Sequence, residues 1–154
     1  MTTIRFLDYL FTKKVSDFKH PTGNYSLKFP NGWRMKKINS SEHLFTEIST
    51  NHGIIINVYS ITDKSLDSIL KSHRDKCLEE EFCPQKQKFK DFNLISWVYN
   101  FDRCKTIELK RIYYNSATIL DVSFCIKSDM ADDKIEVELV KEKLLFQTLE
   151  LKKN

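Results

Sequence analysis

The stretch YSLKFPNGW, residues 25–33, decides the fold of this chain. Aromatic and aliphatic residues at positions 25, 27 and 29 alternate with polar ones, which is the pattern of a half-buried strand. Pro30 cannot donate a backbone hydrogen bond, and Asn31 and Gly32 tolerate the backbone angles of a tight turn. We therefore expect the chain to reverse here into a first hairpin, and we expect Trp33, which begins the second strand, to anchor the core.

The residues on both sides of this stretch predict a mixed fold. Apolar residues at helical spacing indicate helices over residues 1–14, 65–80 and 128–146. Alternating or continuous apolar residues indicate strands near 43–49, 54–59, 85–90, 92–101, 104–114 and 117–127. Strands this close in sequence are joined by hairpins, so the sheet is expected to be antiparallel. The predicted fold class is α/β (α+β): an antiparallel sheet of about six or seven strands covered by helices, as an α/β/α sandwich.

Length and composition favour one domain over residues 1–154. The chain has 41% hydrophobic residues and only three Gly and three Pro, so no linker or compositional break divides it. The four cysteines show no C-x-x-C spacing, and we expect reduced thiols in a cytoplasmic protein. Within this domain, residues 1–14 are expected to form a short amphipathic N-terminal helix and residues 24–151 the sandwich. No signal peptide or membrane-spanning segment is expected, and weak attachment of residues 1–14 to a membrane surface is the alternative.

Basic residues are spread along the chain. The chain has 25 Lys and Arg residues and 21 acidic residues, which gives a net charge of +4. A surface that binds nucleic acid would need the basic residues to be clustered. Lys86, Lys88 and Lys90 alternate with other residues, which places the three ammonium groups on one face of a strand. We interpret them as a solvated face, with a phosphate-binding stripe as the alternative, and predict no nucleic-acid partner.

The order of these elements resembles the PsbP-like α/β/α sandwich superfamily. The resemblance covers about residues 25–150 and rests on an aromatic strand, the F-P-x-G-W pattern at Phe29 to Trp33, an apolar strand at residues 54–59, and a helix opened by Ser65 and Leu66. The superfamily groups the photosystem protein PsbP, a Ran-binding nuclear transport factor and many small bacterial domains. The resemblance implies a domain, plausibly bacterial, that binds a protein partner without catalysis. It transfers no site residue and no cofactor.

Two groups of residues are candidates for chemistry. His73 and Cys77 lie one helical turn apart and Cys83 follows, but zinc needs a fourth ligand and the first two continue an apolar stripe, so we predict packing and no metal site. Cys104 or Cys125 would need a nearby His to act as a nucleophile, and Cys125 lies in an apolar strand. No catalytic or nucleotide-binding motif occurs in the chain.

Two further groups are candidates for binding. The acidic runs at residues 79–81 and 129–133 lack the ordered loop of a calcium site, and helix capping and solvation explain them. An aromatic-rich region contains Trp97, Tyr99, Tyr113 and Tyr114, with one ring of the tyrosine pair on each face of a strand. Core filling is one interpretation of these rings. The other is a patch that binds a partner, and these four residues are the candidate partner-binding site.

The expected function is therefore a non-catalytic intracellular protein-binding domain, with an immunity or secretion-associated role in a bacterium as one possibility. The alternative is a small-ligand carrier or an enzyme with a polar site between sheet and helices. That alternative would draw on His43, His52 or Cys104, and it requires at least two of these side chains to converge in a pocket.

Overall fold

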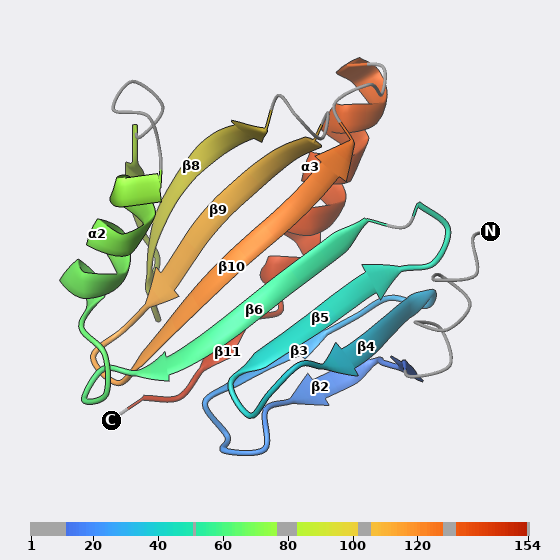
Figure 1. The fold of residues 1–154 in the computed structure, drawn as a ribbon. Coiled ribbons are helices and arrows are strands. Elements are labelled where there is room, and N and C mark those ends of the chain that lie inside the picture. Colours follow the sequence, from blue (N-terminus) through green and yellow to red (C-terminus); the bar gives the residue numbers. More distant parts are fainter. Residues whose placement is uncertain (1–11, 51, 77–82, 102–105, 128–131, 154) are drawn as a thin grey trace.

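The computed structural model describes residues 12–50, 52–76, 83–101, 106–127 and 132–153. Strands dominate this part of the chain, and two helices accompany them (Figure 1). The strands are β1 Lys13–Lys14, β2 Asp17–Lys19, β3 Tyr25–Lys28, β4 Trp33–Lys37, β5 Glu42–Glu47, β6 Gly53–Ser60, β7 Gln85–Lys88, β8 Asn93–Phe101, β9 Thr106–Tyr114, β10 Thr118–Lys127 and β11 Glu150–Leu151. The helices are α2 Leu66–Lys76 and α3 Asp132–Phe146.

Eight of these strands form one large sheet in the order β1-β4-β5-β6-β10-β9-β8-β7. Every pair of neighbours in it is antiparallel, as predicted for consecutive strands with short connections, and the non-consecutive pairs β1·β4 and β6·β10 are antiparallel too. The long strands β8, β9 and β10 lie close to their predicted positions. The expected number of about six or seven strands was too low. The strand expected near 85–90 is present as β7 at one sheet edge, whereas the polar residues of β1 at the other edge have no alternation of apolar residues to reveal a strand.

The remaining three strands form a second sheet in the order β11-β3-β2. The decisive stretch therefore behaves differently from the expected hairpin, because β3 pairs with β2 and β11 while β4 pairs with β1 and β5. The turn at Pro30 to Gly32 carries the chain from one sheet to the other. Gly32 has a φ of 98°, which glycine adopts without the strain that a Cβ would bring. The sequence correctly predicted a turn at Gly32, but it did not show which strands pair with β3 and β4 on either side of the turn.

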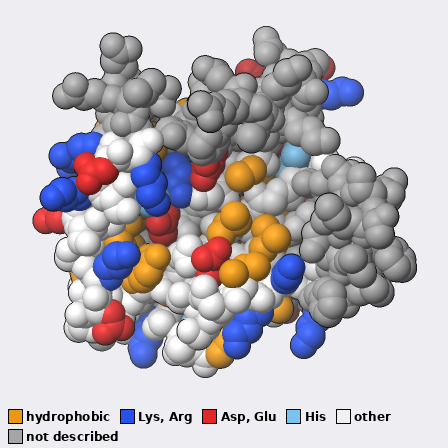
Figure 2. All heavy atoms as spheres, in the orientation of Figure 1, with side chains coloured by type: hydrophobic (Ala, Val, Ile, Leu, Met, Phe, Trp, Pro, Cys, Tyr) orange, Lys and Arg blue, Asp and Glu red, His pale blue; other side chains and the backbone are white. Residues whose placement is uncertain are grey.

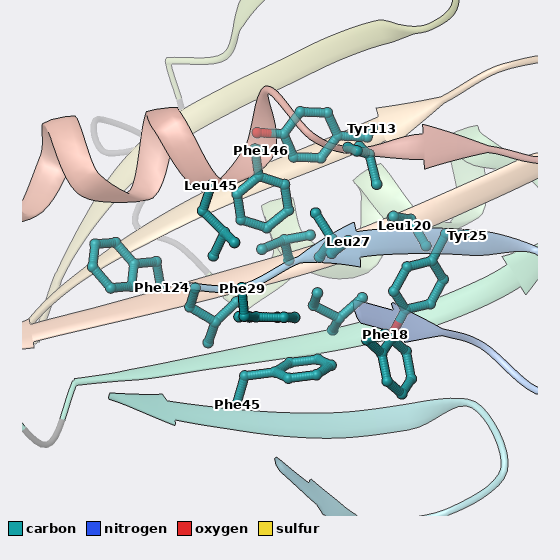
Figure 3. Close-up of a cluster of buried hydrophobic side chains, with 14 of the residues drawn as sticks. Phe18, Tyr25, Leu27, Phe29, Phe45, Tyr113, Leu120, Phe124, Leu145 and Phe146 are labelled. Atoms are coloured by element: carbon teal, nitrogen blue, oxygen red, sulfur yellow. The ribbon is translucent and has the colours of Figure 1, made fainter. Parts of the chain in front are cut away.

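The main core lies between the two sheets and α3 (Figure 3). Tyr25 and Leu27 from β3 are each 1% exposed, and they face the large sheet, where Phe45 is fully buried. Phe29 stacks on Phe45 with ring centroids 4.6 Å apart. Trp33 is 6% exposed and contacts Phe29, which confirms its expected place in the core. The apolar residues of the alternating stretch 25–29 thus lie on the side of the second sheet that packs against the large sheet.

The two helices lie on opposite faces of the large sheet (Figure 1). Ser65 caps α2 by accepting a hydrogen bond from the Ser68 backbone N–H. On the α2 face, Ile69 joins a small cluster on β8 to β10, whereas Leu44 and Ile55 of β5 and β6 stay half-buried. Apolar side chains accordingly lie open on this face beside charged ones in Figure 2. The fold is α+β with a mostly antiparallel sheet, and α2 covers only part of its face.

The N-terminal expectation is corrected where the structure describes it. Residues 1–11 lie outside the described residues, but Lys13 and Lys14 form a strand that pairs with Met35 and Arg34 of β4. The predicted helix over 1–14 therefore does not extend to its expected end. The two lysines point away from the core at a sheet edge, a position where charged residues discourage further strand pairing.

Candidate functional site

A charged network lies beneath α2, on the large sheet. His73 of α2 places its Nε2 atom 2.6 Å from Oδ2 of Asp121, which projects from the middle of β10. The edge of the His73 ring meets Trp97 of β8, with centroids 5.5 Å apart. Both polar side chains are largely shielded, at 15% and 11% exposure. The contact fixes α2 to the strand by a hydrogen bond as well as by apolar packing.

Lys110 of β9 joins the same network. Its Nζ lies 3.4 Å from Oδ1 of Asp121 and 3.7 Å from Oε1 of Glu108, and it donates a hydrogen bond to Oγ of Ser123. Lys110 and Ser123 are direct cross-strand partners, which explains why the two side chains meet. An ammonium group donates and does not accept, so Lys110 is arranged here as a donor and not as the base of a serine nucleophile.

The electrostatic balance at Asp121 favours its ionised form. Burial alone raises the pKa of a carboxyl group, but the hydrogen bond from His73 and the nearby Lys110 ammonium outweigh it and hold the pKa of Asp121 below its usual value. Its Oδ1 atom lies within ion-pair distance of Lys110 without an aligned hydrogen bond among the described residues. A polar cavity of about 270 Å³ opens beside the network.

The opposite helix interface contains a different buried carboxylate. Glu142 of α3 faces the sheet, and its Oε2 lies 2.9 Å from Nη2 of Arg111 on β9. Neither Glu142 oxygen accepts an aligned hydrogen bond from another described residue, despite the short approach of Arg111. Burial therefore prevails over the attraction of Arg111 and raises the pKa of Glu142 to about 7.

A second glutamate of α3 also faces inward. Glu138 lies 3.2 Å from Nδ1 of His52, and its other oxygen accepts a hydrogen bond of 3.1 Å from Lys141. Lys141 also reaches Glu47 of β5, at 3.4 Å. Because Glu138 and Glu142 lie one turn apart, they occupy one side of α3 and place two carboxyl groups against the sheet.

The outer side of α3 is apolar. Val137, Val140 and Leu144 are 54%, 56% and 55% exposed, and their spacing of three and four residues aligns them along the helix. The inward side contains the two glutamates beside Leu139 and Leu145. We call Val137, Val140 and Leu144 the outer stripe.

The four aromatic residues predicted to bind a partner do not form one surface. Trp97 is 5% exposed beneath α2, and Tyr113 is 3% exposed on the opposite face, where it stacks on Phe146 at 5.0 Å. Tyr114 is half-buried against the α2 cluster. The side chain of Tyr99 lies outside the described residues. For Trp97 and Tyr113, the core-filling interpretation describes their positions.

The residues named for a polar enzyme site also lie apart where they are described. His43 pairs across the strands with Ile56, whereas His52 precedes Gly53, the partner of Thr46. The four residues from His52 to Ile56 correspond to about 13 Å along an extended chain. Burial lowers the pKa of His43, whose ring lies near His20, while His52 contacts Glu138. Cys104 lies outside the described residues.

The other candidates from the sequence do not assemble into a site in the described residues. No group of three His, Cys, Asp or Glu there is arranged to hold a metal, and Cys77, the acidic residues 79–81 and Asp129 are outside that part of the chain. Cys83 is exposed and Cys125 is half-buried, and burial raises the pKa of the Cys125 thiol. The lysines of the 86–90 stripe are exposed, in and just after the edge strand β7.

Sequence reasoning missed Lys110, Asp121 and Glu142 as members of buried networks. The local signal for two of them was present, because Asp121 interrupts the apolar run ILDVSF and Lys110 follows a leucine in a strand of alternating character. A charged residue at the centre of such a strand is buried only when it is paired. Its partner on a helix nearly fifty residues away could not be read from that run.

Comparisons with known proteins support the fold and not a function. The sequence matches no protein-family model and no curated protein. The structure is similar to cyanobacterial PsbP (CyanoP) from Synechocystis sp. PCC 6803, with a TM-score of 0.61, 12% identity and 92% of each chain covered. LpqN of Mycobacterium tuberculosis, a protein involved in cell envelope biogenesis, gives a TM-score of 0.54 at 9% identity, with 99% of this chain and 98% of LpqN covered.

A third similar structure is a protein from Bacteroides thetaiotaomicron. It has a TM-score of 0.62 and 13% identity, and the match covers 92% of this chain but 50% of the Bacteroides chain. At these identities the three likenesses concern the fold alone. The chain has the PsbP-like fold, as its order of elements predicted. None of the described helices is both long and apolar enough to span a membrane.

Proposed function

We propose that this protein is a non-catalytic binding domain that docks a helix of a protein partner on the outer stripe of α3. The observation that carries the proposal is the inverted helix, in which Glu138 and Glu142 face the sheet while Val137, Val140 and Leu144 face solvent. Burying the glutamates has an energetic cost, and exposing the three apolar side chains forgoes hydrophobic stabilisation. A partner that covers the stripe would recover part of that stabilisation.

The geometry of the stripe fits another helix. Side chains spaced by three and four residues form the seam along which two helices pack, because both present the same period. Exposed charged groups flank the stripe, with Glu136 and Lys143 on one side and Lys134 and Lys141 on the other. Three of the four are basic, so a partner helix with an apolar face and acidic flanks is complementary to them.

The absence of a catalytic role is part of the proposal. In the most polar interior site, Lys110 and His73 are both engaged by Asp121. A nucleophile would need a neighbouring base that is free to accept its proton. The cytoplasmic location, the bacterial origin and the immunity or secretion-associated role expected from the sequence remain predictions.

The experiment that tests the proposal compares three baits in an extract of the native host. The full chain, the Val140→Glu variant and the Ile38→Glu variant are used for affinity capture, and recovered proteins are quantified by mass spectrometry. Ile38 is the matched control, because it is 47% exposed in the turn between β4 and β5, away from α3. Both substitutions place a carboxylate on an exposed apolar position, so both variants should keep the wild-type melting temperature.

A protein recovered with the wild-type and Ile38→Glu baits and lost with Val140→Glu would support docking on α3. Equal recovery with all three baits would exclude the outer stripe as the docking surface. Recovery of no protein by any bait would count against the binding function itself. A loss with both variants would show that the loss is not specific to α3, and it would count against the outer stripe as the docking surface.

A further inference from the structure

A cavity lies beside the C-terminal end of α3. It has a volume of about 350 Å³ and is bounded by the turn between β7 and β8, by β8 and β9, and by the last turn of the helix. Sites that hold an organic group are typically concave, largely apolar and supplied with a few polar groups. The residues that matter for its chemistry are three aromatic and three cationic ones: Phe89, Phe92, Phe146, Lys90, Arg111 and Lys143.

Aromatic rings form the wall of the cavity. The Phe89 and Phe92 rings lie 5.1 Å apart across a turn that the Phe89 backbone closes by donating to the Phe92 carbonyl. Phe92 meets the edge of Tyr113 at 5.4 Å, and Tyr113 stacks on Phe146 with an interplanar angle of 4°. Phe89, at the end of this row, is 41% exposed. The row therefore continues from the core to the surface and ends in a ring available for stacking.

Cationic groups predominate around these rings. Lys90, Arg111 and Lys143 line the cavity, and the one carboxylate among its lining residues is that of Asp91. Asp91 is already engaged, because Lys153 donates a hydrogen bond of 2.7 Å to it. The ammonium groups of Lys90 and Lys143 belong to exposed residues, whereas Arg111 also contacts Glu142 below. An anionic group at the cavity mouth would meet a net positive charge.

The cavity is continuous with the outer stripe. Gln147 lines the cavity, and its backbone N–H bonds to the Lys143 carbonyl, which extends the helical turn. Gln147 follows Val140 by seven residues and Leu144 by three, so it lies on the same line along the helix. A partner helix lying on the outer stripe would therefore end at the cavity.

We infer that this cavity receives an anchor from the docked partner, namely an aromatic side chain followed by a carboxylate. The inference rests on the proposed function and names the chemistry of the partner. The aromatic ring stacks against the row that Phe89 ends, and the carboxylate pairs with Lys90 and Lys143. Interfaces derive much of their affinity from a buried aromatic anchor in a pocket, with charged pairs selecting the partner.

The test uses 3-phenylpropionate, a phenyl ring with a carboxylate, and its neutral amide, 3-phenylpropanamide. Each is titrated into the full chain, and backbone amide shifts are followed by NMR. We expect the acid to shift the amides of Phe92, Tyr113 and Phe146 and to bind at least about tenfold more tightly than the amide. Lys143→Glu should weaken the binding of 3-phenylpropionate by a similar factor. Lys134→Glu, the same charge change on the other flank of α3, should leave its affinity unchanged.

Three results would overturn the inference: equal affinity of acid and amide, equal effects of the two lysine variants, or shifts confined to residues away from the cavity. Val140→Glu separates this inference from the proposed function, because it should abolish partner capture and leave binding of the probe intact. If partner capture depends on Val140 but 3-phenylpropionate does not bind, the anchor in the cavity would be excluded and docking on α3 would stand. Probe binding at the cavity without Val140-dependent capture would overturn docking on α3.

Discussion

The two helix interfaces of this protein each bury a carboxylate, and the two carboxylates behave in opposite ways. Asp121 beneath α2 accepts a hydrogen bond from His73 and lies within ion-pair distance of Lys110, and its pKa falls below the usual value. Glu142 beneath α3 has Arg111 alone, without an aligned hydrogen bond, and its pKa rises to about 7. Asp121 is 9% exposed and Glu142 is 2% exposed, so the deeper burial of Glu142 and its lack of an aligned hydrogen bond both favour its protonated form.

The largest effect should come from removing Asp121. In Asp121→Ala, Lys110 and His73 lose the acceptor they share, and we expect a loss of about 3 kcal/mol in unfolding free energy at pH 7. Because the folded pKa is lowered, Asp121 contributes its stability above the unfolded value of about 4, and the contribution is lost as the pH falls through the folded pKa. Urea denaturation at pH 7 and at pH 3 measures both effects.

Ser123→Ala is the control for that experiment, because it removes a hydroxyl from the same network and leaves its charges in place. It should cost about 1 kcal/mol. A cost for Asp121→Ala no larger than for Ser123→Ala would show that the buried charge is not compensated by its neighbours as the geometry indicates.

The next effect is of opposite sign. A raised folded pKa means that folding favours protonated Glu142, so the wild type should lose stability as the pH rises from about 4.5 to about 7. Glu142→Gln cannot ionise, and it should be more stable than the wild type by about 2 to 3 kcal/mol at pH 8 and nearly equal to it at pH 4. Thermal unfolding across this range measures the difference.

Glu136→Gln provides the comparison on the exposed side of the same helix, where it should shift stability little at any of these pH values. If Glu142→Gln destabilised the protein at pH 8, the ion pair with Arg111 would outweigh the burial of the carboxylate, and the contrast with Asp121 would disappear.

The smallest effect is expected at Lys141, the exposed residue that contacts both Glu138 of α3 and Glu47 of β5. The Lys141 ammonium bonds to Glu138 and Glu47, and the hydrogen bond to Glu138 is the main reason that the pKa of Lys141 is raised. Its side chain is 45% exposed, so solvent screens both contacts, and Lys141→Ala should cost less than about 1 kcal/mol, and less still in high salt. Chemical denaturation at two ionic strengths checks this value. A cost comparable to that of Asp121→Ala would show that exposure does not limit the strength of these pairs.

Local patterns predicted the strands and the middle helix well. Ser65 opens α2 as expected, and β8, β9 and β10 follow the apolar runs assigned to them. These features depend on side chains within a few residues of one another, which a sequence displays directly. The candidate partner-binding site could not be predicted in the same way. The sequence around Trp97 and Tyr113 is the same whether these rings are exposed for binding or buried under a helix, and the structure shows that they are buried.

The side of α3 that faces the sheet is the clearest case of a missed assignment. Apolar residues occur all around this helix, so their periodicity does not select one face, and it does not show that Val140 and Leu144 lie on the outer side. Glu138 and Glu142 face inward, where they meet His52, which directly precedes β6, and Arg111 on β9. The spacing of residues along the chain does not predict contacts between side chains so far apart in sequence.

The sequence by itself determined where the chain extends, coils and turns, including the break at residues 30–32. It also determined the PsbP-like order of elements, since that order is a property of the chain read from end to end. Only the tertiary structure decided that β3 and β4 belong to different sheets, that Asp121 meets His73, and that the outer stripe remains open. The physical reason is that local propensity acts over a few residues, whereas strand partners, buried charge pairs and helix faces depend on which distant segments pack together.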